Sequence, residues 1–101
     1  MKVIVAVESS TKDGTDDPKY EVPFRYDENR SHWIAASDSI RIADEAILGI
    51  HAEIDGHLKH LNLYFLHRSA QIATMICGVS GRQALSFRFS PTHSITASVE
   101  A

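Results

Sequence analysis

Three side chains in the middle of the chain have types and a spacing that could do chemistry. Glu53, His57 and His60 stand four and then three residues apart, so on a helix they would share one flank. Two imidazoles and a carboxylate can hold a transition metal, and a histidine can exchange protons near neutral pH. The sequence shows no H-E-x-x-H motif and no evident fourth ligand. These residues define the alternative hypothesis, a small metal- or histidine-dependent enzyme.

The other reactive residue types show no catalytic arrangement. No G-x-S-x-G motif surrounds a serine, and Cys77 follows Met75 and Ile76, as is typical of a small core residue. A chain with one cysteine forms no internal disulfide, which agrees with a reducing cytosol. We therefore predict a cytoplasmic protein with no cofactor, no bound metal and no catalytic residue.

Acidic residues are concentrated in the first half of the chain. Residues 1–50 carry ten acidic and six basic side chains, and the whole chain has a formal net charge of −3. This balance argues against direct binding to nucleic acid phosphates and suits a basic protein partner. No apolar run approaches the roughly 20 residues that a membrane-spanning helix needs, so we expect no membrane association.

A partner surface also needs apolar anchors, because charge complementarity mainly speeds association. The candidate partner-binding residues combine acids with nearby aromatic side chains: Asp16, Asp17, Tyr20, Tyr26, Asp27, Glu28 and Trp33. They favour a small non-enzymatic module that binds another protein. Such a protein would act as an inhibitor or antitoxin-like protein on a macromolecular partner, such as a nucleic-acid-binding toxin or a phage-defence complex.

A long amphipathic helix over residues 43–61 is the main element expected to position these side chains. Its apolar residues recur at spacings of three and four, as on one helix face: Ala43, Ile47, Ile50, Ile54, Leu58 and Leu61. Gly49, Ala52 and Gly56 gather roughly opposite this stripe. Two glycines inside a helix indicate the close approach of another backbone, so this ridge predicts a homodimer contact.

Residues 3–7 are a continuous apolar run, which predicts a strand covered on both sides. Alternating apolar and polar residues predict strands at 20–26, which Pro23 places at a sheet edge, and at 85–89 and 95–99, and a further short strand is expected at 32–37. Residues 61–66 fit either a strand or an extension of the helix, and a second short helix is expected between Ser69 and Gly78. The predicted fold is a single α+β domain over residues 1–101, with the helices packed on one face of an antiparallel sheet.

Residues 20–50 resemble the N-terminal domain of HicB-like antitoxins. The matching features are a strand over Tyr20–Tyr26, an acidic turn, a second strand over Trp33–Ala36, and a helix that begins at Glu45 and Ala46. The resemblance implies a small β-β-β-α domain that binds another protein.

Overall fold

The computed structural model describes residues 1–10, 18–43, 46–79 and 83–100, and these ranges form strands and turns without any helix. The nine strands run in chain order as follows: β1 Lys2–Ser9, β2 Lys19–Pro23, β3 Arg25–Asp27, β4 His32–Ala43, β5 Ala46–Asp55, β6 His60–His67, β7 Ala70–Gly78, β8 Ala84–Ser90 and β9 His93–Glu100.

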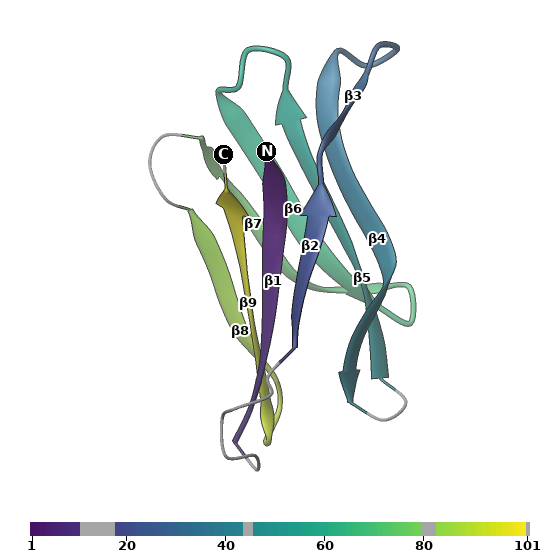
Figure 1. The fold of residues 1–101 in the computed structure, drawn as a ribbon, viewed down its shortest axis with the longest axis vertical. Coiled ribbons are helices and arrows are strands. Elements are labelled where there is room, and N and C mark those ends of the chain that lie inside the picture. Colours follow the sequence, from purple (N-terminus) through teal and green to yellow (C-terminus); the bar gives the residue numbers. More distant parts are fainter. Residues whose placement is uncertain (11–17, 44–45, 80–82, 101) are drawn as a thin grey trace.

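The strands form two antiparallel sheets that lie face to face (Figure 1). Sheet A has the order β2-β1-β9-β8, and sheet B has the order β3-β4-β5-β6-β7. The chain passes from sheet A to sheet B at Phe24, between β2 and β3, and returns after β7. Because β1 also pairs with β9 from Lys2–Glu100 to Ser9–His93, the two ends of the chain lie side by side (Figure 1).

The inner faces of both sheets contribute to one hydrophobic cluster. In sheet A it contains Val5 and Ile95, and in sheet B it contains Ile54, Leu63 and Phe65, all fully buried. None of the described charged or polar residues is buried, and no described buried side-chain nitrogen or oxygen lacks a hydrogen-bond partner. The interior is therefore a dry apolar layer, and any chemistry of the described residues belongs to the outer surfaces.

The predicted helix over residues 43–61 is wrong. Strand β5 and the turn after it occupy most of this segment, and alternate side chains of β5 point into the core: Leu48, Ile50, Ala52 and Ile54. Two members of the expected apolar stripe are exposed instead, Ile47 at 47% and Leu58 at 48%. The burial pattern has the period of a strand, so the stripe does not lie on one face.

The second helix is also wrong, because Ala70–Gly78 is strand β7, and residues 61–66 adopt the strand alternative within β6. The α+β class is replaced by an all-β, two-sheet sandwich. Strands at residues 3–7, 32–37, 85–89 and 95–99 are confirmed, including the hairpin of β8 and β9. Residues 20–26 were expected as one edge strand, but they divide at Phe24 into β2, at the edge of sheet A, and β3, at the edge of sheet B. The helix implied by the HicB-like resemblance is absent too, since Ala46 begins β5.

Candidate functional site

A hollow of about 410 Å³ lies on the outer face of sheet B. Strands β4, β5 and β6 line it with the following residues: Ala36, Ser37, Asp38, Gly49, Ile50, His51, Tyr64 and Leu66. It is shallow and open to solvent, which suits one side chain of a partner better than an enclosed small molecule.

Small residues and an irregular strand create the hollow. Gly49 lies between the two neighbouring strands, where an added Cβ would be 3.6 Å from the Ser37 carbonyl oxygen and 3.8 Å from the Leu66 Cβ. Both distances are ordinary contacts, so the space above Gly49 is free for a side chain. The register of β4 against β5 shifts between Ser37 and Ile40. A bulge of this kind bends a strand and re-aims its side chains.

His51 and Tyr64 form one side of the hollow. The two residues are direct partners in the register of β5 and β6, which places their side chains next to each other on one face of the sheet. Their rings stack with centroids 5.1 Å apart and planes inclined by 23°. This stack is a rigid aromatic platform that a partner could contact at little entropic cost.

Beside this platform, Glu53 is held by three basic side chains. Its Oε1 accepts a hydrogen bond of 2.9 Å from Arg30 and lies 3.3 Å from His32 Nδ1, and its Oε2 lies 3.7 Å from His51 Nε2. Partial burial acts to raise the pKa of Glu53, but the hydrogen bonds from His32 and Arg30 outweigh it. The net result is a pKa below the ordinary 4.5. Glu53 is therefore ionised, and its contacts with Arg30 and His32 connect strand β5 to the hairpin of β3 and β4.

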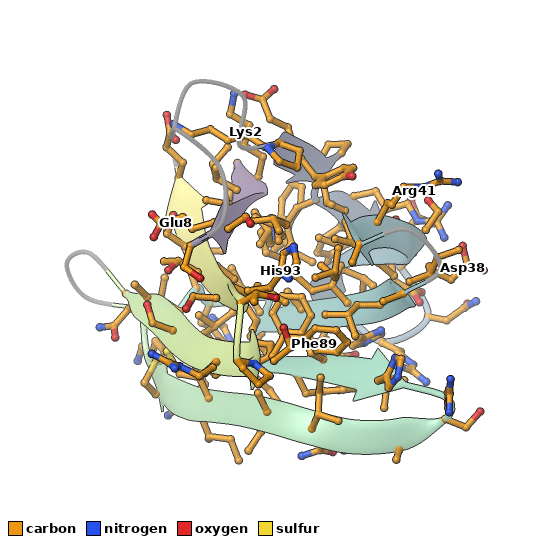
Figure 2. All side chains as sticks on the ribbon, turned by 90° about the horizontal axis from the view of Figure 1, so that it is seen from below. Lys2, Glu8, Asp38, Arg41, Phe89 and His93 are labelled. Atoms are coloured by element: carbon orange, nitrogen blue, oxygen red, sulfur yellow. The ribbon has the colours of Figure 1, made fainter. Side chains whose placement is uncertain are left out.

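Asp38 supplies an acidic group at the hollow. Figure 2 shows it at the periphery of the molecule, pointing away from the space between the sheets. Asp38 is exposed and forms no ion pair with another described residue. Its negative charge is therefore available to a cation that enters the hollow.

The hairpin of β3 and β4 brings together four of the seven predicted partner-binding residues. Tyr26 and Trp33 are register partners whose rings meet edge to face at 5.1 Å. Asp27 and Glu28 follow in the same hairpin, where Asp27 accepts a hydrogen bond from the Asn29 amide. Tyr20 lies apart from them on β2 and donates a hydrogen bond to the Arg41 carbonyl, while Asp16 and Asp17 fall outside the described residues.

The alternative set of Glu53, His57 and His60 is not brought together. His57 lies in the connection between β5 and β6 and His60 is the first residue of β6, and their backbone amides donate to the Asp55 carboxylate. Glu53 contacts other histidines, as described above. In the described parts of the chain, no group of three His, Cys, Asp or Glu side chains is placed to hold a metal ion.

The three residues of the predicted dimer contact, Gly49, Ala52 and Gly56, also lie apart from one another. Gly49 is at the outer hollow, Ala52 is fully buried in the core, and Gly56 is in the turn after β5. The three residues share no face, so the helix contact on which a homodimer was predicted does not exist.

Sequence reasoning missed most of the hollow, above all His51, Tyr64 and Leu66. A two-residue period through β5 and β6 would have placed His51 and Tyr64 opposite the core-facing residues. Nothing in the local sequence indicates that the two residues are register partners.

We found no match to this chain among protein-family models, curated proteins or solved structures. Within the described residues there is no helix with the length and hydropathy to cross a membrane.

Proposed function

We propose that this chain is a non-enzymatic protein-binding module that acts as an inhibitor or antitoxin-like protein on a macromolecular partner. In this proposal the partner docks on the outer face of sheet B and places a lysine or arginine side chain in the hollow above Gly49. The proposal rests on the hollow, which combines free space above Gly49, the stacked rings of His51 and Tyr64, and the exposed carboxylate of Asp38.

The chemistry of the hollow matches an amphipathic cation. The methylene stem of a lysine or arginine would lie along Leu66 and Tyr64, and its charge would approach Asp38. The net charge of −3 would help to steer a basic partner toward this surface. The exposed Tyr26 and the acids of the hairpin of β3 and β4 extend the same acidic and aromatic character beyond the hollow.

The enzymatic alternative has less support than binding. A carboxylate that serves as a general base near neutral pH needs a raised pKa, whereas the pKa of Glu53 is lowered and its Oε1 is engaged by Arg30 and His32. For the cellular location we propose the cytoplasm, on the ground that Cys77 is a free thiol.

The test is a substitution that fills the hollow without disturbing the fold. Gly49→Leu adds a side chain where the neighbouring atoms lie at ordinary contact distance. Ser86→Leu is the matched control, since Ser86 is exposed on β8 in the other sheet. A partner is first captured from native cells with the parent protein and identified by mass spectrometry. It is then purified, and its affinity for each variant is measured by calorimetry.

We expect Gly49→Leu to weaken binding by at least about tenfold, and Asp38→Lys to do so mainly through a slower association rate. Ser86→Leu should bind like the parent. Equal affinity of the parent and the Gly49→Leu variant would show that the partner does not use the hollow. A purified parent that turns over a substrate at a rate abolished by Glu53→Gln would instead support the enzyme.

A further inference from the structure

Strand β7 is a sheet edge whose one irregularity is a register shift against β6 that leaves Ile72 without a partner. It pairs with β6 on one side and stands last in the strand order of sheet B. Its sequence over Ala70–Gly78 is AQIATMICG, nine residues without a charged side chain or a proline. Exposed edge strands normally carry charges or prolines, or are very short, because their unpaired backbone groups would otherwise pair with another chain.

The other three sheet edges all carry such protection. Strand β2 contains Lys19, Glu21 and Pro23, and β8 contains Arg88. Strand β3 is only three residues long and pairs with the start of β4, whose remaining length carries Asp38 and Arg41. Among the described edges, β7 is thus the one that lacks a charged residue and a proline and is not short, and the bulge at Ile72 is its only protection, which points to a partner for its free side.

The hydrogen-bond pattern identifies which backbone groups of β7 face outward. Val79 N–H donates to the Lys59 carbonyl at 3.0 Å, so this pair is hydrogen-bonded across the hairpin. Such pairs alternate along an antiparallel ladder. The backbone groups of Met75 and Cys77 therefore point toward β6, and those of Thr74 and Ile76 point to the free edge.

We propose that β7 pairs antiparallel with β7 of a second copy of this chain, which joins the two copies of sheet B into one continuous sheet. The register that overlaps the complete strand places Thr74, in its regular part, opposite Thr74 of the second copy, and Ile76 next to the bulge at Ile72 of that copy. This arrangement has the two-fold symmetry of most homodimers. It rests on the strand edge and not on the partner proposed for the hollow.

The side chains of β7 are complementary to themselves in this register. Ile72 and Ile76 are 40% and 76% exposed and both point to the outer face. Pairing with the second copy would bring Ile76 of one copy close to the bulged Ile72 of the other, and contacts between β-branched side chains on neighbouring strands stabilise sheets. No like charges meet, and the two hollows would open on the same side of the extended sheet. The dimer thus explains the most exposed isoleucine of the described chain.

The proposed register can be tested with charged substitutions at Thr74, because Thr74 of one copy lies opposite Thr74 of the other. Thr74→Lys and Thr74→Glu are prepared separately, and the mass of each is measured by light scattering at about 100 μM and compared with the parent. Like charges directly opposite destabilise a strand pair, so each variant alone should be monomeric. An equimolar mixture should recover a dimer with one copy of each variant. Ser86→Lys, on edge strand β8, is the matched control.

The parent and Ser86→Lys are expected at twice the mass of the 11.2 kDa chain. Circular dichroism of the single variants shows whether they keep the parent's strand content, and recovery of the dimer on mixing requires that both are folded. A monomeric parent, a dimeric Thr74→Lys variant, or a mixture that stays monomeric would each overturn the proposal.

Discussion

Gly49, in β5, and Gly56, in the turn after β5, differ in how close an added Cβ would come to neighbouring atoms. At Gly56 a Cβ would lie 2.7 Å from the Ser31 carbonyl oxygen, whereas at Gly49 the nearest atom is 3.6 Å away. A backbone oxygen at 2.7 Å must move, because it cannot rotate aside as a flexible side chain could. Gly56 is therefore required for the close approach of two turns, and Gly49 keeps a surface open.

We expect Gly56→Ala to lower the free energy of unfolding by about 1–3 kcal/mol, the usual cost of forcing atoms into a packed contact. Gly49→Ala should leave stability unchanged or raise it by up to about 1 kcal/mol, because alanine loses less conformational freedom on folding than glycine. Urea denaturation of both variants measures the difference. Equal destabilisation by the two substitutions would contradict the packing of Gly56 against Ser31.

Asp55 links side-chain ionisation to the turn between β5 and β6. The backbone amide of His60, followed by those of Lys59 and His57, donates to its carboxylate and holds the pKa of Asp55 below the ordinary 3.8. Because these bonds favour the charged form, they contribute stability above pH 3.8. That contribution is lost as the pH falls through the lowered pKa of the folded state.

The parent should therefore lose more stability on acidification below pH 3.8 than Asp55→Asn does. The asparagine oxygen can still accept from the same amides, but it does not titrate. Because the pKa of Glu53 is also lowered, its protonation on acidification reduces stability in the parent and in the Asp55→Asn variant alike. Thermal melts between pH 2.5 and 6 provide the comparison, and parallel curves for the two proteins would argue against the Asp55 contribution.

At the scale of elements, the ion pair between Arg30 and Glu53 joins the hairpin of β3 and β4 to β5. The Arg30 side chain is 59% exposed, so solvent screens the pair and its contribution is small. We expect Arg30→Ala to cost less than about 1 kcal/mol, with a smaller effect in 1 M salt than in 20 mM salt. A loss of several kcal/mol in urea denaturation that did not depend on salt would assign Arg30 a packing role instead.

Strand β5 shows why the sequence predicted a helix where a strand forms. Ile50 and Ile54 are spaced by four residues, which is compatible both with a helix turn and with alternate positions of a strand. The overlooked signal is Asp55-Gly56 between two alternating apolar segments, because Asp-Gly is a strong hairpin signal. Hairpin β8–β9 has no such ambiguity, since its apolar residues alternate strictly and no helical spacing competes.

The candidate site is harder to predict than the strands that carry it. Three strands supply its walls, and their alignment depends on the bulge between Ser37 and Ile40 and on the pairing of His51 with Tyr64. A one-residue change of register would turn these side chains to the other face. Only the tertiary pairing decides this register, so sequence periodicity alone could not locate the hollow.

At the scale of the whole molecule, the packing of the two sheets determines which apolar side chains are buried. The side chains expected to face a helix face sheet B instead. Val3 and Ile95 are buried, and Phe87 packs against Phe65 with ring centroids 5.3 Å apart. The strands of sheet A therefore bury an apolar face, as a sheet covered by a helix would, but the element that covers this face is a second sheet.

Substitutions at Ile47 and Ile54 distinguish the observed two-sheet sandwich from the predicted helix in one experiment. Both belong to the apolar stripe that predicted a helix, but Ile54 is fully buried and Ile47 is 47% exposed. Ile54→Asp places a carboxylate in the dry layer between the sheets. It should cost several kcal/mol, enough to unfold a domain of this size. Ile47→Asp should change stability by less than about 1 kcal/mol, because its side chain remains in water.

Circular dichroism and urea denaturation of the two variants measure this contrast under identical conditions. A buried helical stripe would make both substitutions severe, since both side chains would lie in the same core. The sandwich makes only Ile54→Asp severe, because alternate residues of β5 point to opposite sides of the sheet. Comparable loss of structure in the two variants would contradict the strand register of β5, and with it the position assigned to the hollow.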